Sequence, residues 1–310
     1  SSGSANSGED GTYVIHGLAP GTYAVRFDPM MHNWYYDDGL LSEYFDGAPE
    51  WQLAAPVDVL VGEDTGSINA TLRQGAMITG TVYGPDGTTP APYVSVYTSP
   101  GTTLGDATTG ADGTYTIKGV PAGTYSVRFD PWNHNDMYGA RLLSEYYENT
   151  RDESAATTRW LEPGETWSGV DATLEEGATL SGTVTGDDGA KLGGITVRLT
   201  DPVTGVEIWR GTDASGFWTA DAVPPGSYIL EFDPSNYNDA YDASYVREFW
   251  SDKAGFWEAD PVSVSLAETR SDLNVQLVQG GLTLTANIGG LPAGAGDTYQ
   301  WIDLYERLAD

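Results

Sequence analysis

The 310-residue sequence contains no cysteine and only three histidines, His16, His32 and His134. The absence of cysteine excludes disulfide bonds and every thiolate site, and it fits an exported bacterial protein that avoids thiol chemistry. The sequence also lacks a G-x-S-x-G motif, a phosphate-binding loop and an H-E-x-x-H motif. We therefore expect no enzyme activity and no catalytic residues, although the many carboxylates leave a glycosidase pair as an open alternative.

Basic residues are scarce as well: 14 Lys and Arg stand against 45 Asp and Glu, for a formal net charge of −31. Such a charge repels a phosphate backbone, which argues against nucleic-acid binding and against anionic membranes. No run of 18 apolar residues is present, so we expect no membrane insertion. Cations are the small partners that this charge favours.

The most prominent feature of the sequence is an internal repeat. The stretch GTYVIHGLAPGTYAVRFDP (11–29) returns as GTYTIKGVPAGTYSVRFDP (113–131) and, more loosely, as GFWTADAVPPGSYILEFDP (216–234). Asp28, Asp130 and Asp233 mark one position three times, which gives a period of about 102 residues. This is the size of a typical domain, so each unit can bury its own core.

Within a unit, apolar residues alternate with the period of a half-buried strand. Tyr23, Val25 and Phe27 share one face, and Tyr13 and Ile15 share one face of the preceding strand. The LAPG, VPAG and VPPG sequences between these strands predict turns. About seven such strands per unit predict an antiparallel sandwich. The segments LLSEYFDG, LLSEYYEN and YVREFWSD depart from the pattern, and either a short helical turn or an extended crossing loop fits them.

The G-x-V-x-G-x-x-G pattern near a unit start, followed by DGTYTIKGVPAGTYSVRF, resembles a known family. It is similar to the prealbumin-like sandwich of collagen-adhesin B-type repeats and carboxypeptidase regulatory-like domains of bacterial surface and secreted proteins. The resemblance covers nearly the whole chain. It implies an all-β fold of tandem antiparallel, prealbumin-like or Ig-like sandwiches, and it says little about function, because such units serve as stalks, spacers and binders.

The unit boundaries divide the chain unevenly. Residues 75–176 and 177–279 are complete units, whereas residues 1–74 lack the first two strands, which MITGTV and YVSVY supply elsewhere. Residues 280–310 supply a unit start with nothing after it. The two partial segments together have about the length of one unit, so we interpret them as one sandwich split between the two ends of the sequence.

An open sandwich exposes apolar side chains and strand edges, and a complementary strand would cover both. We therefore predict donor-strand complementation between copies, which propagates head to tail as a fibre unless it closes a ring. The predicted acceptor residues are Tyr13, Ile15, Tyr23, Val25 and Phe27, and the predicted donor residues are Leu282, Leu284, Ala286, Ile288, Ile302 and Leu304.

Two alternatives to assembly remain open. The sequence is consistent with a piece of a longer repeat array, and three sandwiches that bend back could close within one copy. The segment WIDLYERL also fits a helix face, which would make it a poor second strand.

The acidic loops that follow the repeated strands offer a candidate calcium site, because Ca²⁺ binds six to eight oxygen atoms. The alternative is that the Asp residues cap turns and that the Glu residues have backbone or arginine partners. We expect no required cofactor, and Ca²⁺ is the one ion that we predict. The candidate ligands are Asp28, Asn33, Glu43, Asp130, Asn135, Asp136, Glu145, Asp233, Asn238, Asp239 and Glu248.

Aromatic residues are abundant, with 10 Trp and 19 Tyr. Most suit core and inter-unit packing, but some lie in the polar loops, where exposed rings could stack on sugars. These candidate glycan-binding residues are Trp34, Tyr35, Tyr36, Trp132 and Tyr138. The sequence thus predicts an extracellular structural protein that assembles with copies of itself. The alternative is a stalk or carbohydrate-binding region of a larger adhesin or secreted polysaccharide-active enzyme.

Overall fold

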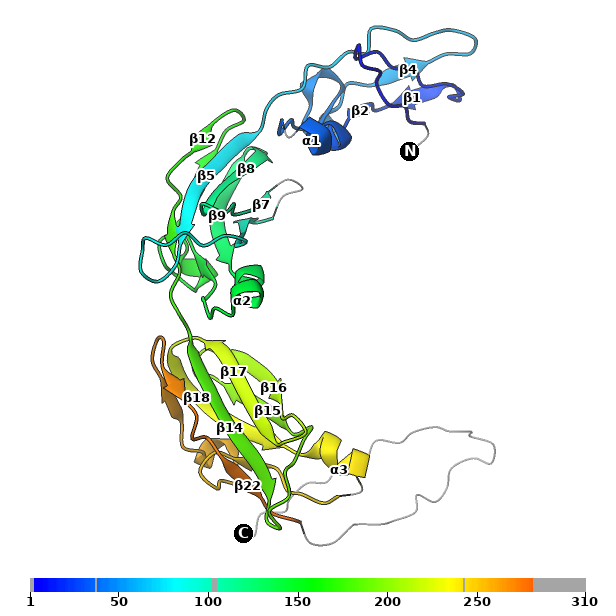
Figure 1. Ribbon diagram of the computed structural model, residues 1–310. Helices are drawn as coiled ribbons and strands as arrows, with labels where there is room; N and C mark the ends of the chain where they lie inside the picture. The colour runs from blue at the N-terminus through cyan, green and yellow to red at the C-terminus, as the bar shows by residue number, and fades with distance from the viewer. Residues whose placement is uncertain (1–2, 37, 102–104, 242, 281–310) are drawn as a thin grey trace, which may run out of the picture.

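The computed structural model describes residues 3–36, 38–101, 105–241 and 243–280. Figure 1 shows three β-rich units that follow one another in a bent row, joined by short linkers. We refer to residues 1–74, 75–176 and 177–279 as the first, second and third units. Strands predominate in the described part of the chain, and no helix there is long and apolar enough to cross a membrane.

The second and third units are two-layered sandwiches with matching topology. In the second unit the elements are β5 (Ala76–Tyr83), β6 (Ser95–Ser99), β7 (Asp106–Thr108), β8 (Thr114–Val120), β9 (Gly123–Asp130), α2 (Trp132–Tyr138), β10 (Glu145–Tyr146), η3 (Glu153–Ala155), β11 (Arg159–Leu161), β12 (Thr166–Trp167) and β13 (Ala172–Thr173). In the third unit they are β14 (Ala178–Gly186), β15 (Thr196–Thr200), β16 (Glu207–Gly211), β17 (Phe217–Val223), β18 (Gly226–Asp233), α3 (Ser235–Tyr241), β19 (Glu248–Phe249), η4 (Phe256–Glu258), β20 (Val262–Val264), β21 (Thr269–Arg270) and β22 (Val275–Leu277).

One long strand organises one sheet of each complete unit, and we call β5 and β14 the hub strands. β5 pairs antiparallel with β8 on one side and parallel with β12 and β13 on the other. β14 pairs in the same way with β17, β21 and β22. The other sheet has the order β10-β9-β6-β7 with β11 also on β9, and its counterpart in the third unit matches it. Every second residue of β5 near its start, Ala76 and Ile78, is fully buried between the layers.

The first unit contains only part of this architecture. Its elements are β1 (Gly21–Tyr23), β2 (Arg26–Phe27), α1 (Met30–Tyr36), β3 (Glu43–Tyr44), η1 (Phe45–Gly47), η2 (Trp51–Leu53) and β4 (Val57–Val59). The pairs β1·β4 and β2·β3 correspond by the repeat period to β9·β11 and β9·β10. Counterparts of the hub strand and of β6 are missing from the described residues of this unit.

Short helices follow each repeated Asp-Pro pair, where we expected acidic loops from the sequence. An Asp side chain accepts a hydrogen bond from the backbone N–H two residues later, at 3.1 Å from Asp28 to Met30 and 2.9 Å from Asp233 to Ser235. The ring of the following proline presets the backbone angle of a first helical turn. α1, α2 and α3 therefore begin where the strands end, and each lasts seven residues.

The all-β sandwich prediction is confirmed. The complete units have nine strands each in the described residues, where we expected about seven, because the closing segment is split into two short strands and because β10 and β19 lie in segments that we did not predict as strands. Those closing strands pair in parallel with the hub, which strand alternation alone does not reveal. The segments after the helices form a two-residue strand followed by a turn or a 3-10 helix, β3 with η1 in the first unit.

Candidate functional site

The predicted acceptor residues form one apolar face in the first unit. All five side chains are half-buried there: Tyr13, Ile15, Tyr23, Val25 and Phe27. Their counterparts in the second unit are buried in the core: Tyr115, Ile117, Tyr125, Val127 and Phe129. In the third unit the same positions are buried again: Trp218, Ala220, Tyr228, Leu230 and Phe232. The same alternating pattern therefore makes a core in two units and an open face in the other.

The open face keeps the local geometry of a complete unit. The rings of Tyr13 and Phe27 meet edge to face at 5.9 Å, and those of Tyr115 and Phe129 meet in the same way at 6.0 Å. The Tyr13 hydroxyl donates to the carbonyl oxygen of Ile68 at 2.7 Å, as the Tyr115 hydroxyl donates to Val170. Burial raises the pKa of the Tyr13 hydroxyl. The first unit therefore keeps the ring contact and the tyrosine hydrogen bond of a complete unit.

In the first unit, the two segments that would pair with a hub strand do not form strands. Residues 12–18 correspond to β8, and residues 70–71 correspond to β13, yet both are irregular. The closing residues Ile68 and Leu72 are only half-buried, whereas Val170 and Leu174 are fully buried in the second unit. One missing strand thus leaves two neighbouring segments without their sheet.

The predicted donor residues fall outside the described residues. Leu282, Leu284, Ala286, Ile288, Ile302 and Leu304 all belong to 281–310. Their pairing with the open face stays a prediction.

The three repeated asparagines of the predicted calcium loops have a backbone-binding role. The Asn135 side chain donates to the carbonyl of Leu142 at 2.8 Å and accepts from its N–H at 2.9 Å. Asn33 and Asn238 make the same pair of bonds with residues seven positions later. Both polar ends of each amide are occupied in this way, and they hold each helix against the loop that follows it.

The three repeated aspartates cap the helices, as described above, and Asp130 does so through a 3.1 Å bond from Trp132. Asp136 lies on α2, and Asp239 lies on α3. Among the residues that the structure describes, no three His, Asp or Glu side chains are grouped to hold a metal ion. Calcium binding by these loops stays a prediction.

The repeated glutamates stand at the start of β3, β10 and β19, where Glu43 and Glu145 are buried and Glu248 is half-buried. Glu145 is 3% exposed, and one of its carboxyl oxygens has no hydrogen-bond partner, as is also true of Glu248. Burial raises the pKa of Glu145 to about 7, although Arg151 opposes the rise and Glu175 adds to it. Burial also raises the pKa of Glu248 to about 7, with a further contribution from Asp252. An unpaired buried carboxyl favours its neutral form.

The candidate glycan-binding aromatics all belong to the helices α1 and α2. Trp34 is 80% exposed on α1 and Trp132 is 74% exposed on α2, at positions that are not equivalent in the repeat. Tyr36 and Tyr138 are also exposed, and each stacks on the histidine four residues before it, at ring distances of 4.7 and 4.8 Å. Tyr35 belongs to the same helix as Trp34. The rings are therefore distributed over two units.

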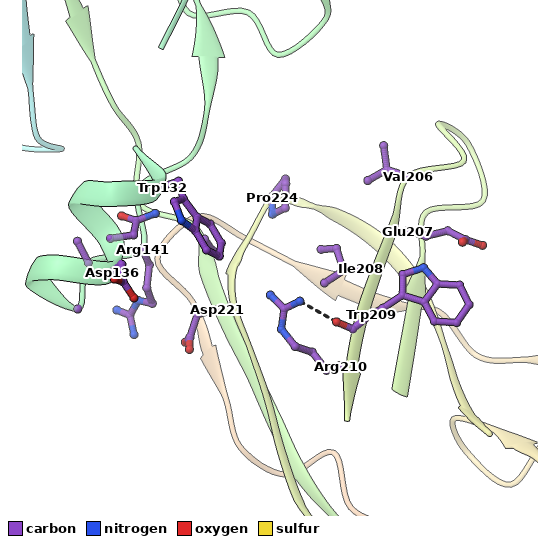
Figure 2. A pocket seen from close by; sticks show the side chains of 14 residues that line it. Trp132, Asp136, Arg141, Val206, Glu207, Ile208, Trp209, Arg210, Asp221 and Pro224 are labelled. Atoms are coloured by element: carbon purple, nitrogen blue, oxygen red, sulfur yellow. Dashed lines mark hydrogen bonds between the residues drawn. The ribbon is translucent and has the colours of Figure 1, made fainter. Parts of the chain in front are cut away.

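A cleft between the second and third units was absent from our expectations. It has a volume of about 730 Å³ and lies between α2 with its following loop and β16 with the turn before β18. Figure 2 shows Trp132 and Arg141 on one side of it and Ile208, Arg210 and Pro224 on the other. No pattern within a single repeat could predict it, because the cleft arises from how two units meet.

Comparison with known proteins places half of the chain in one family. The model of the carboxypeptidase regulatory-like domain matches residues 77–132 and 179–278, which lie within the second and third units. No curated protein matches the chain.

Several solved structures are similar at low sequence identity. The Bacillus anthracis TIE protein is 13% identical over 88% of this chain, which spans 44% of that protein, with a TM-score of 0.26. The minor pilin GBS52 of Streptococcus agalactiae is 12% identical over 69% of this chain and 100% of its own, with a TM-score of 0.32. A streptococcal ancillary pilin is 12% identical over 86% and 77%, with a TM-score of 0.33.

Proposed function

The chain belongs to the carboxypeptidase regulatory-like domain family, and on that premise we propose that it is a non-enzymatic structural component of an extracellular fibre. In this proposal, residues 280–310 of one copy complete the open face of residues 1–74 in the next copy. The observation that carries the proposal is the burial difference between five equivalent side chains in the first and second units.

The energy available from completing the open face supports the proposal. Full burial of a medium-sized apolar side chain stabilises a structure by about 1.5–3 kcal/mol. Five side chains of the open face, together with Ile68 and Leu72, are already half-buried, so each would gain only part of this energy, on the order of 5 kcal/mol in all before the cost of ordering the donor. The hub strand would also supply hydrogen-bond partners to residues 12–18 and 70–71, as β5 does for β8 and β13.

The register of the donor can be derived from the hub strands. Gly280 corresponds to Gly75 and Gly177, because all three donate a backbone hydrogen bond to the loop after the helix of the unit before them. Gly281 then adds one residue relative to the other units, and this addition places Leu282, Leu284 and Ile288 at the positions of Ala76, Ile78 and Val82. A shift of one residue reverses the face of every side chain, so the extra glycine sets the phase of the donor.

The same register places Ala286 where both hub strands have glycine. A Cβ atom at Gly80 would overlap the carbonyl oxygen of Val170, and one at Gly182 would overlap that of Leu273. The equivalent carbonyl in the first unit belongs to Ile68, which must therefore move to admit Ala286. We expect Ala286→Gly to tighten the association of copies.

A reciprocal pair of variants tests complementation. Ile15→Asp places a charge in the acceptor and leaves the donor intact, whereas Leu284→Asp does the reverse. We expect the unmodified chain to form concentration-dependent polymers by light scattering and fibres by electron microscopy. Each variant alone should stay monomeric, and a mixture of the two should stop at a dimer, because only one acceptor and one donor remain functional.

The control is Val14→Asp, next to Ile15 on the opposite, 63% exposed face, and it should polymerise as the unmodified chain does. Polymers that survive deletion of residues 281–310 would contradict the proposal. So would a chain that stays monomeric at millimolar concentration, whether its open face is left uncovered or is closed by its own tail.

A further inference from the structure

The cleft between the second and third units has the size of a ligand site. Its volume of about 730 Å³ lies within the range of roughly 300–1,000 Å³ that is usual for ligand pockets. One wall comes from α2 and the loop at Gly139–Arg141, and the other comes from β16 and Pro224. Two separate folding units thus contribute to a single concave surface.

An unpartnered indole forms the apolar part of the cleft. Trp132 is 74% exposed, and Figure 2 shows its ring above the cleft on the side facing Pro224. On β16, Ile208 and Arg210 extend toward this space, whereas the side chains of Glu207 and Trp209, which also line the cleft, lie on the other side of the strand. The Trp209 ring lies beneath the guanidinium of Arg198 at 5.1 Å. Trp132 is therefore the flat aromatic surface that the cleft offers to a ligand.

Some charged side chains of the cleft have ion-pair or hydrogen-bond partners within the protein, and others have no charged partner. Arg141 bonds to Glu176 and to the Thr179 hydroxyl, which in turn donates to Asp221 at 2.6 Å. Arg210 makes a 2.8 Å bond to the carbonyl oxygen of Trp209. In the part of the chain that the structure describes, Arg210 has no carboxylate within ion-pair distance, and the Asp136 carboxylate has no hydrogen-bond partner.

We propose that this cleft binds an uncharged oligosaccharide, with a sugar ring stacked on Trp132 and its hydroxyls bonded to Arg210 and Asp136. A hydroxyl both donates and accepts, so it can satisfy a guanidinium and a carboxylate in the same site. The C–H face of a sugar ring suits the negative face of an indole.

Other ligand classes fit the cleft less well. A polyanion would meet Asp136 and Asp221 in a chain whose net charge is −31. A polycation would meet Arg141 and Arg210, and an apolar peptide would bury the open charges without partners. The site lies outside residues 1–74 and 281–310, so the inference is independent of strand complementation.

Affinity electrophoresis of the full chain through gels containing starch, mannan, xylan, mixed-linkage β-glucan or cellulose derivatives tests the inference. At least one of the neutral polymers should retard the chain. Trp132→Ala and Arg210→Ala should each weaken that retardation about tenfold, because each removes one of the proposed contacts. Both side chains are exposed, so the melting temperature should stay unchanged.

Trp257→Ala is the matched control, because Trp257 is 89% exposed on η4 of the third unit and does not line the cleft. It should leave retardation intact. The inference is overturned if none of the neutral polymers retards the chain, if Trp132→Ala binds as well as the unmodified chain, or if Trp257→Ala is equally impaired. Preferential retardation by polygalacturonate would show instead that the ligand is a polyanion.

Discussion

Within the residues that the structure describes, the first and second units differ chiefly in whether a hub strand is present. Both have the Tyr–Phe ring pair at about 6 Å, and both have a tyrosine hydroxyl bonded to the closing segment. In the second unit β5 turns residues 114–120 into a strand and seals the core, whereas residues 12–18 of the first unit are irregular. Local sequence thus determines where side chains meet, and the central strand determines whether their neighbours become a sheet.

The largest effect should come from damage to a hub strand. Gly182→Val would drive a side chain into the backbone at Leu273, which approaches β14 too closely for any Cβ. We expect the free energy of unfolding of the third unit to fall by more than about 4 kcal/mol. Such a loss is enough to open this unit into a state like that of the first unit. Urea unfolding followed by the fluorescence of buried Trp218 would measure the change.

The control for that experiment is Gly211→Val, because a Cβ at Gly211 meets nothing within 4 Å. Gly211→Val should lower the free energy of unfolding far less than Gly182→Val, since Gly211 belongs to β16, which lies at the edge of its sheet. Equal costs at the two glycines would show that the close approach at Leu273 is unimportant for the hub.

One substitution made in both units compares them directly. Ile117→Ala removes a fully buried side chain and should cost about 3 kcal/mol, whereas Ile15→Ala in a chain ending at residue 280 should cost less than about 1 kcal/mol. Calorimetry of each variant would measure both. If the full chain raises the cost of Ile15→Ala toward that of Ile117→Ala, the tail covers the open face.

The sequence predicts the cores better than it predicts the connections. Alternation at Tyr13, Ile15 and Phe27 identifies the inward face of the first unit, and the same pattern identifies the cores of the other two. The helices were missed, because a seven-residue segment has too few turns for a helical period. They are held by tertiary contacts such as that of Asn135 with Leu142, which no short-range pattern contains.

The candidate sites were predictable to different degrees. The open face follows from the repeat alone, since its residues align with buried ones. The cleft beside Trp132 does not, because Arg210 reaches it from a hairpin strand more than 70 residues away in sequence. The capping role of Asp28 and its equivalents was one of the two interpretations that the sequence left open.

The two complete units should make the stability of the chain depend on pH. The pKa of Glu145 and of Glu248 rises from 4.5 to about 7 on folding, so the folded chain holds protons that the unfolded chain has released. Stability from these groups is complete below pH 4.5 and falls as the pH rises toward 7. For Glu145 we expect a change on the order of 2 kcal/mol.

Glu145→Gln combined with Glu248→Gln should flatten this dependence, because a neutral amide has no proton to lose. Melting temperatures between pH 5 and pH 8 would measure it. Glu258→Gln, which changes an exposed carboxylate of the third unit, is the control and should leave the slope intact. A slope that persists in the double variant would show that other groups set it.

The smallest effect concerns the two junctions. At both, the loop after the helix bonds to the linker through the backbone, from Leu41 to Arg73 and from Leu143 to Glu175. Only the second junction adds the Arg141–Glu176 ion pair, because the equivalent residues at the first are Gly39 and Gln74. Both partners are about one-third exposed, so Arg141→Ala should lower the free energy of unfolding by only about 0.5–1 kcal/mol.

Small-angle X-ray scattering of the Arg141→Ala variant should nevertheless show a wider range of angles between the second and third units, since the arginine is the side chain that joins the loop, the linker and Thr179. An unchanged scattering profile would mean that the backbone bonds alone set the angle, and the two junctions would then be equivalent.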